Sequence, residues 1–314
     1  MMAAERPAEL IERLPGVRGR YEENVALAKF TWFRAGGPAD VVFHPADEDD
    51  LRQFLQAKPA GVPVTVIGVC SNLLIRDGGI EGVVIRLGRP FANIDIDGSE
   101  VRAGAAALDI NVARACADAG VAGFEFLIGV PGTIGGALRM NAGAYDRELS
   151  DLVLGARAVS AAGEVREYDM AELGFSYRHC GAPEGLIFLS AHMRGDADDP
   201  QAIRARLEEI REARETTQPI RTRTGGSTFT NPGGILKAWQ LIEQAGCRGL
   251  MRGGAQVSPQ HCNFLVNTGT ATAADIEALG EEVRRRVAAE TGVTLEWEIR
   301  CIGERETPPV EDPA

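Results

Sequence analysis

Residues 129–136 read Gly-Val-Pro-Gly-Thr-Ile-Gly-Gly and run into Ala-Leu-Arg-Met-Asn-Ala-Gly. Positions without bulky side chains, placed ahead of a short helix, offer backbone amides to a pyrophosphate. The stretch matches neither Gly-x-Gly-x-x-Gly nor the Gly-Lys-Ser/Thr ending of a P-loop, which argues against a Rossmann site and a nucleoside triphosphatase. The alternative is a corner in which glycine serves only close packing.

A second glycine loop lies upstream, where residues 66–75 read Val-Ile-Gly-Val-Cys-Ser-Asn-Leu-Leu-Ile. A strand that ends at Gly68 and is followed by Ser71 and Asn72 offers exposed amides and two short hydrogen-bonding side chains. Such a turn favours an anion-binding nest, although a simple tight turn between strands also fits. Two glycine-rich phosphate candidates in one half of the chain make a packing role for both less convincing.

A third motif, residues 225–234, reads Gly-Gly-Ser-Thr-Phe-Thr-Asn-Pro-Gly-Gly and places Ser227 on a flexible turn between Arg223 and Asn231. It contains no Gly-x-Ser-x-Gly and no Ser-His-Asp set accompanies it, so a hydrolase nucleophile is a poor interpretation. The hydroxyl could instead donate a proton to a strongly basic carbanion or enolate. The common alternative is a serine that caps its own turn.

Two charged residues are candidates from opposite ends of the chain. Arg178 follows Tyr177 and precedes a Gly-x-Pro loop, and Glu298 is expected on the polar face of a strand over residues 293–302. A surface ion pair or a solvated charge is the default for each. The arginines between Arg204 and Arg223 are interpreted as a solvated helix face, and only Arg223 is given a functional role.

The composition excludes several classes of function. Of 314 residues, 45% are hydrophobic and 25% are charged, and the net charge is −12, which disfavours nucleic-acid binding. No apolar window approaches the ~20 residues of a membrane span, and the beginning lacks the apolar region of a secretion signal, so we expect a cytoplasmic protein with no membrane partner. Six scattered cysteines and four histidines form no ligand pattern, which predicts free thiols and no metal site.

Apolar periodicity and turn residues predict both helices and strands. Helices are expected at residues 47–57, 107–119, 201–216, 235–245 and 273–290, and strands at 39–43, 64–67, 82–87, 186–193 and 293–302, with a hairpin over 152–168. A composition change near Gly195 suggests a boundary. The proposed domains are an N-terminal segment (1–22), a first region (23–195), a C-terminal domain (196–305) and a disordered tail (306–314).

Taken together, the motifs resemble one family more closely than any single motif does. Their order and spacing are similar to those of the UDP-N-acetylenolpyruvoylglucosamine reductase family, over roughly residues 20–305. The short interval between Arg178 and the helix at 201 resembles the subgroup that lacks an extra substrate-capping loop (type II). The segments that carry the resemblance are 31–38, 68–74, 129–143 with its Met140-Asn-Ala-Gly-Ala-Tyr145, 175–178, 226–232, 255–258 and 295–300.

The resemblance implies an α+β fold. Two lobes, split near residues 88–100, would form an FAD-binding region of the vanillyl-alcohol-oxidase type, and a C-terminal α+β domain would bind the substrate. FAD would be held without a covalent bond. By the family pattern the cofactor-binding residues are Gly68, Cys70, Ser71, Asn72, Leu73, Gly129, Pro131, Gly132, Thr133, Gly135, Gly136, Asn141 and Ala142.

The resemblance also implies a reaction in peptidoglycan precursor synthesis. NADPH would reduce FAD, and a hydride would then pass from flavin N5 to C3 of UDP-N-acetylglucosamine enolpyruvate, giving UDP-N-acetylmuramate. Arg178, Glu298 and Ser227 match the catalytic positions. Arg178 suits a carboxylate, a protonated Glu298 would donate a hydrogen bond to the developing enolate, and Ser227 would protonate C2.

Tyr177, Arg223, Asn231 and Gln256 are the expected substrate-binding residues, and the protein is expected to be a monomer or a weak oligomer. The sequence departs from the family pattern in two motifs. In the first glycine loop, Val69 and Cys70 stand where small residues or glycine are usual. Thr230 replaces the usual lysine, and Arg223 is the candidate to replace that cation.

Two other functions compete with this interpretation. One is another flavoprotein of the same superfamily, such as an oxidase of small alcohols or hydroxy acids; many of these bind FAD covalently through a histidine, which neither glycine loop contains. The other is a non-catalytic nucleotide-sugar binding protein. The presence of all three matching catalytic positions argues against a silent binding protein.

Overall fold

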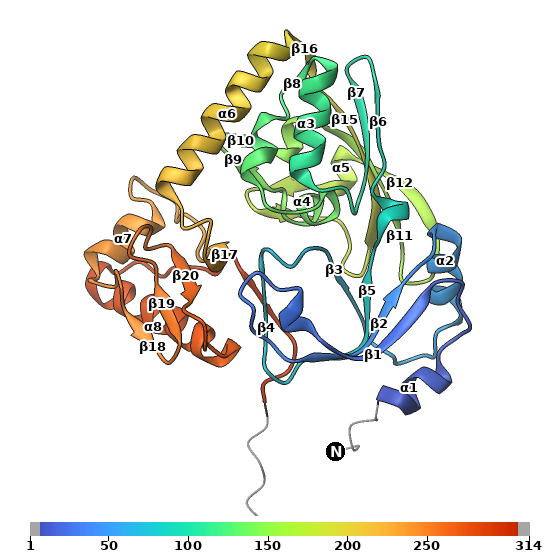
Figure 1. Cartoon of the computed structure of the whole chain (residues 1–314), viewed down its shortest axis with the longest axis horizontal. Helices are drawn as coiled ribbons and strands as arrows, with labels where there is room; N and C mark the ends of the chain where they lie inside the picture. The colour runs from blue at the N-terminus through green and yellow to red at the C-terminus, as the bar shows by residue number, and fades with distance from the viewer. Residues whose placement is uncertain (1–6, 307–314) are drawn as a thin grey trace, which may run out of the picture.

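Three lobes, each built around one larger β-sheet, make up the part of the chain that the computed structural model describes, residues 7–306 (Figure 1). The first lobe holds the N-terminal third, the second the middle of the chain, and the third the C-terminal part. The predicted tail 306–314 lies outside the described residues except for its first position. No helix among residues 7–306 is long and apolar enough to cross a membrane.

The first lobe is a four-stranded sheet in the order β1-β2-β5-β3, in which only β1 is antiparallel to its neighbour. Alternation along β2 sends Val41 and Phe43 to the face covered by α2, and Val42 to the other face. Asp47 caps α2 by accepting a hydrogen bond from the amide of Asp50, as the sequence predicts. The elements are α1 (Pro7–Arg13), β1 (Arg20–Ala26), η1 (Leu27–Lys29), β2 (Pro38–His44), α2 (Glu48–Ala57), β3 (Val64–Ile67), β4 (Leu73–Ile75) and β5 (Ile80–Arg86).

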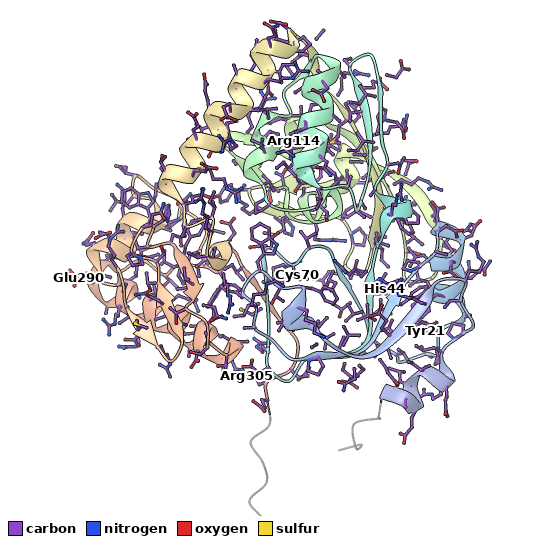
Figure 2. All side chains as sticks on the ribbon, in the orientation of Figure 1. Tyr21, His44, Cys70, Arg114, Glu290 and Arg305 are labelled. Carbon is purple, nitrogen blue, oxygen red and sulfur yellow. The ribbon has the colours of Figure 1, made fainter. Side chains whose placement is uncertain are left out.

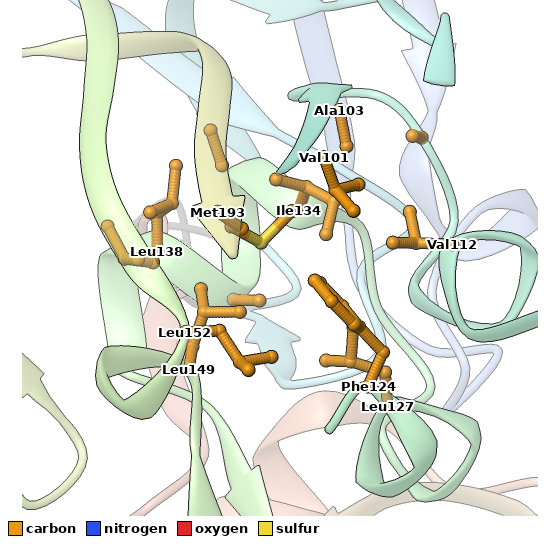
Figure 3. Packing of buried hydrophobic residues seen from close by; sticks show 14 of the residues in the cluster. Val101, Ala103, Val112, Phe124, Leu127, Ile134, Leu138, Leu149, Leu152 and Met193 are labelled. Carbon is orange, nitrogen blue, oxygen red and sulfur yellow. The ribbon is translucent and has the colours of Figure 1, made fainter. Parts of the chain in front are cut away.

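The second lobe is a five-stranded antiparallel sheet, β12-β11-β15-β7-β6, with α3 and α4 packed on one face. Figure 3 shows Ile134 and Leu138 of α4 meeting Met193 of β15 and Val101 of β7 in this core. The predicted hairpin over residues 152–168 is confirmed as β11 and β12. The elements are η2 (Arg89–Phe91), β6 (Ile94–Asp97), β7 (Glu100–Gly104), α3 (Asp109–Ala119), β8 (Val121–Ala122), η3 (Glu125–Gly129), α4 (Ile134–Met140), β9 (Gly143–Ala144), β10 (Arg147–Glu148), η4 (Leu149–Asp151), β11 (Val153–Val159), β12 (Val165–Asp169), α5 (Met170–Leu173), β13 (Phe175–Ser176), β14 (His179–Cys180), β15 (Ile187–Arg194) and β16 (Asp196–Ala197).

The third lobe packs α7 and α8 against the sheet β17-β20-β19-β18. Helix α6 leads into it from the second lobe, whose core includes Ile203 and Leu207 of α6, and runs along the edge of the molecule between the two lobes (Figure 1). The elements are α6 (Pro200–Thr217), β17 (Arg223–Ser227), α7 (Ala238–Gln244), β18 (Met251–Arg252), β19 (Ala255–Val257), β20 (Phe264–Asn267), α8 (Ala273–Thr291) and β21 (Arg300–Ile302).

The third lobe is joined firmly to the first, although the two are distant in sequence. Strand β21 pairs in parallel with β4, and the carboxylate of Asp77 accepts hydrogen bonds from the first two amides of α8. Arg76 forms a two-pronged ion pair with Glu277 at N–O distances of 3.0 Å. These contacts fix where β21 and α8 lie relative to the loop that precedes β4.

The expected strand over residues 293–302 is wrong for most of its length, because only Arg300–Ile302 pairs as a strand. Leu295 and Ile299 are buried on one side, as the alternation predicts, but the segment instead follows the third lobe in an irregular path. Trp297 lies against Gly280 of α8, where a Cβ atom would clash with the indole. Glu298, expected on the polar face of this strand, has a side chain only 17% exposed.

Two further expectations need correction. Helix α7 begins at Ala238 and not near Ile235, because Asn231 Oδ1 accepts the hydrogen bond of the Ala238 amide and ends the preceding loop there. Ser227 is not on a flexible turn: it is the last residue of β17 and is paired with Phe264 across a bulge that contains Gly226 (φ 83°).

Candidate active site

Residues from all three lobes line a cavity with a volume of about 380 Å³, which is in the usual range for a ligand pocket. Twelve of the thirteen residues expected to bind the cofactor line it, and so do the three expected catalytic residues, Arg178, Ser227 and Glu298. The twelve are Gly68, Cys70, Ser71, Asn72, Leu73, Gly129, Pro131, Gly132, Thr133, Gly135, Gly136 and Ala142.

The first glycine loop forms the wall of the cavity on the side of the first lobe. Its amides at Val69, Cys70 and Ser71 find no acceptor among the described residues, and Cys70 adopts a left-handed conformation (φ 54°). This is the backbone arrangement of an anion-binding nest. Figure 2 shows Cys70 near the centre of the molecule, where the lobes meet. Burial raises the pKa of its thiol to about 11, so the sulfur stays protonated and packs as an apolar group.

The second glycine loop uses part of its backbone to hold itself in place. The amides of Ile134 and Gly135 donate to the carbonyls of Ala107 and Ala105, whereas those of Thr133 and Gly136 meet no acceptor in the described part of the chain. The sequence suggests that the backbone positions of this loop are all free to bind an anion, but the amides of Ile134 and Gly135 are already bonded within the protein. The two loops also touch: a Cβ atom on Gly68 would stand 2.8 Å from the Thr133 hydroxyl. Glycine is required there by a close approach.

Two of the arginines that line the cavity, Arg139 and Arg214, have no carboxylate partner among the described residues. Arg139 donates to the carbonyls of Ala182 and Leu186, and Arg214 donates to Gln218 Oε1. Neither guanidinium is paired with an acid among residues 7–306, and burial lowers the pKa of each from its ordinary value. A buried cation that lacks a counter-ion favours an anionic ligand.

The carboxyl group of Asp109 lies directly behind Gly132. It is fully buried, neither oxygen has a hydrogen-bond partner, and a Cβ atom on Gly132 would stand 2.7 Å from Oδ2. Burial raises the pKa of Asp109 well above its ordinary value. A neutral acid here adds no negative charge beneath the glycine loop.

The three expected catalytic side chains converge on the cavity from two lobes. Arg178 Nε donates to Glu298 Oε1 at 3.2 Å, and their side chains are 19% and 17% exposed. Burial raises the pKa of Glu298, and the neighbouring guanidinium opposes this shift without reversing it. The direction agrees with the expectation of a protonated carboxyl group.

A two-residue hairpin presents Arg178. Strands β13 and β14 pair Ser176 with His179, and between them Arg178 takes a left-handed conformation (φ 55°) that is uncommon for a residue other than glycine. Its Nη2 donates to the carbonyl of Gly143 at 2.8 Å. The guanidinium is therefore held at two points, and its Nη1 makes no hydrogen bond among the described residues.

The backbone segments that carry Ser227 and Glu298 are joined by hydrogen bonds between residues next to them. The carbonyl of Thr228, which follows Ser227, accepts the amide hydrogen bond of Glu298 at 2.8 Å. From the first lobe, Asn72 Nδ2 donates to the carbonyl of Glu298 at 3.0 Å, and the carbonyl of Asn72 accepts the amide of Arg300. The first glycine loop thus fixes the backbone on which Glu298 stands.

Five expected site residues do not line the cavity. Asn141 is buried behind it, and Arg223 is exposed, with its guanidinium near the carbonyl of Gly269. Asn231 caps α7, Gln256 lies within β19, and Tyr177 is 48% exposed with its ring 4.9 Å from the Arg178 guanidinium carbon.

The sequence analysis missed Asp109, Arg139, Arg214 and Gln218, all of which line the cavity. The sequence interpretation places Arg214 on a solvated helix face with the other arginines between Arg204 and Arg223, whereas the structure places it at the wall of the cavity. Only its place at the C-terminal end of α6, where the helix reaches the cavity, distinguishes it. No sequence signal identified that turn.

The fold and the site define a flavoprotein with a two-lobed FAD-binding region. A profile of the FAD binding domain matches residues 39–169, and one described as UDP-N-acetylenolpyruvoylglucosamine reductase, C-terminal domain, matches residues 218–302. Curated UDP-N-acetylenolpyruvoylglucosamine reductases are 61% identical in Parvibaculum lavamentivorans (305 residues, 97% of this chain and 98% of the relative) and 57% identical in Rhodospirillum rubrum (307 residues, 96% of each).

A crystal structure of UDP-N-acetylenolpyruvylglucosamine reductase from Thermus caldophilus is similar in fold, with a TM-score of 0.79 and 34% identity. The match covers 90% of this chain and 99% of that one. The chain belongs to the UDP-N-acetylenolpyruvoylglucosamine reductase family. The predicted family and fold class are confirmed, and FAD is its cofactor.

The cavity fits a dinucleotide that carries a pyrophosphate. Amides without protein acceptors lie on both glycine loops, and Gly136 leaves open space, since a Cβ atom there would meet only the Thr133 hydroxyl at 3.8 Å. The raised pKa of Asp109 favours the neutral acid, which would not repel the phosphates. The residues that would hold the group are those of the two loops, with Arg139 as a neighbouring cation.

Proposed function

We propose that this protein is an NADPH-dependent flavoenzyme that reduces UDP-N-acetylglucosamine enolpyruvate to UDP-N-acetylmuramate for peptidoglycan synthesis. The observation that carries the proposal is the convergence of Arg178, Glu298 and Ser227 on the cavity that both glycine loops line. The family supports it, because the relatives that match nearly the whole chain are named for this reductase activity.

Arg178 is proposed to bind the carboxylate of the enolpyruvyl group. The contribution of bound FAD is a hydride, taken from NADPH and delivered to C3 of the substrate double bond. Electron density then moves toward the carboxylate, and a guanidinium that is already fixed by Glu298 and Gly143 meets this charge without reorganisation. Its Nη1 remains available for the substrate.

Glu298 is proposed to act as a hydrogen-bond donor in its protonated form. An ionised carboxylate would repel the enolate, whereas a neutral acid can accept from Arg178 on one oxygen and donate from the other. The burial that raises its pKa supports this state. Ser227 then delivers a proton to C2, a transfer that the basicity of the carbanion makes feasible once water is excluded.

The diphosphate of the sugar nucleotide needs a nearby cation. Other members of the family have a lysine for this purpose at the position that Thr230 occupies in this chain. Arg214 is a better substitute than Arg223, because Arg214 lines the cavity beside Gln218. Tyr177, Arg223, Asn231 and Gln256 remain proposed contacts for the outer part of the substrate. We also propose that the chain belongs to the subgroup without the capping loop, works in the cytoplasm with six free thiols, and is a monomer or a weak oligomer.

Separate measurement of the two half-reactions tests the proposal. Ser227→Ala should leave flavin bleaching by NADPH unchanged while slowing reoxidation by the enolpyruvyl substrate about 10²–10³-fold, the usual effect of removing one catalytic donor. Stopped-flow absorbance of the flavin follows both steps. Ser99→Ala, in the turn between β6 and β7, is the matched control. Equal losses in both half-reactions would refute the role of Ser227, and a wild-type protein that the substrate cannot reoxidise would refute the activity.

A further inference from the structure

Asn141 was expected at the cofactor site, yet it lies behind the cavity wall and is only 1% exposed. It ends α4 in a left-handed conformation (φ 43°), which asparagine tolerates better than most residues. A residue buried this deeply needs partners for its whole amide group. Those partners connect it to the catalytic arginine.

The side chain of Asn141 makes three hydrogen bonds to two other segments. Its Nδ2 donates to the carbonyl of Ser176 at 3.0 Å and to Glu148 Oε2 at 2.6 Å, and its Oδ1 accepts from the amide of Ser150 at 3.0 Å. Two donor contacts and one acceptor contact determine which way the amide faces. Glu148 and Ser150 belong to the segment that returns from β9, so this segment is fixed as well.

Ser176 is the residue at which the hairpin of Arg178 begins. It pairs with His179, and only Tyr177 and Arg178 stand between them. The other end of Arg178, its guanidinium, donates to the carbonyl of Gly143, two residues beyond Asn141. A Cβ atom on Gly143 would stand 3.0 Å from Arg178 Nη1, so the fit is close. One short segment therefore holds both the backbone and the head of Arg178.

We propose that Asn141 is a positioning residue that acts through Arg178: its amide fixes the β13–β14 hairpin so that the guanidinium faces Glu298 and the substrate carboxylate. The proposal rests on the catalytic role of Arg178 given above. It assigns Asn141 to the step that consumes the substrate, and not to the binding of FAD or to the reaction with NADPH.

Asn141→Asp tests whether Asn141 positions Arg178, because aspartate has nearly the same size and shape as asparagine. The substitution replaces the two donor contacts with repulsion from the Ser176 carbonyl and the Glu148 carboxylate. We expect reoxidation of the reduced flavin by the enolpyruvyl substrate to slow at least about tenfold, as for the loss of one hydrogen bond to a charged group. The flavin content and the rate of reduction by NADPH should stay at wild-type values.

Two further variants keep the test decisive. Asn141→Gly retains the left-handed backbone and removes the side chain without adding a charge, so it covers the case in which the aspartate variant does not fold. Asn93→Asp is the matched control, because Asn93 also donates to a carboxylate (Asp95, 2.8 Å) in the same lobe but on the surface. We expect wild-type behaviour from this control.

A double-mutant cycle with Arg178→Ala separates positioning from general stability. If Asn141 acts through Arg178, then Asn141→Gly should cost nothing more in the Arg178→Ala background. Independent, multiplying losses would overturn the proposal, and so would loss of FAD from Asn141→Gly, which would return this residue to the cofactor site. Failure of Arg178→Ala itself to slow reoxidation would instead overturn the proposed function.

Discussion

Gly136→Ala should strengthen the fold and weaken cofactor binding, and this opposition makes it an informative substitution. Gly136 is the third residue of α4, it is exposed, and a Cβ atom there would meet only the Thr133 hydroxyl at 3.8 Å. Alanine is favoured over glycine in a helix by about 0.5–1 kcal/mol. The melting temperature of the apoprotein should therefore rise by about 1–3 °C in a chain of this size.

The same methyl group would project into the cavity, next to the unpaired amide of Gly136. If that amide binds a cofactor phosphate, the methyl group costs one charge-assisted hydrogen bond, ~1.5–3 kcal/mol, which corresponds to a ~10–150-fold higher Kd for FAD. Quenching of flavin fluorescence on titration of the apoprotein gives the Kd, and circular dichroism gives the melting temperature.

Gly132→Ala provides the contrast within the same loop. A Cβ atom at Gly132 would stand 2.7 Å from the buried Asp109 carboxyl, so this variant should lose both stability and FAD affinity. Loss of FAD from Gly132→Ala would therefore not distinguish a damaged fold from a damaged cofactor site. A Gly136→Ala protein with a higher melting temperature and wild-type FAD affinity would show that the turn at the beginning of α4 lies outside the cofactor site.

Three other outcomes follow from the charged groups of the cavity. Arg178→Lys should slow reoxidation about 10²-fold, because one ammonium group cannot satisfy Glu298, the Gly143 carbonyl and the substrate together; a wild-type rate in stopped flow contradicts this geometry. The pKa of Glu298 is raised and its acid form is proposed to be active, so reoxidation should slow as the pH rises through that pKa, whereas Glu298→Gln should show no such fall. The pKa of Asp109 is raised in the folded state, so between its unfolded-state and folded-state pKa values the folded protein binds more protons than the unfolded chain. As the pH rises through this range, the wild type loses up to ~1.4 kcal/mol of stability per pH unit. Asp109→Asn should therefore melt higher than the wild type at neutral pH, and an equal melting temperature in both proteins would mean that the carboxyl group is not protonated in the fold.

Local signals were sufficient for the regular parts of the fold. The apolar run over residues 39–43, the helix expected over 47–57 and the hairpin over 152–168 depend on neighbouring residues, and the structure confirms each of them. The alternation of apolar residues over 293–302 predicts a strand that is wrong for most of its length, although Leu295 and Ile299 are both buried. An extended chain can bury alternate side chains without pairing with a neighbouring strand. The path of this segment also depends on the space that Gly280 of α8 leaves for Trp297, and the local sequence does not reveal that packing.

The site was predictable where a backbone motif marks it, and much less so where a lone side chain reaches it. Both glycine loops contain positions where a Cβ atom would clash with a neighbouring residue, at Gly68, Gly129 and Gly132, so their sequences carry the signal. Arg214 and Arg223 carry none. Arg214 lies in the last turn of α6 and Arg223 is the first residue of β17, and only the packing of the lobes decides which one lines the cavity. Asp109 is harder still, because an acid in the first turn of a helix usually indicates a favourable, solvated charge. Here the glycine loop of another segment covers it, and burial raises its pKa and so favours the neutral acid behind the cofactor site.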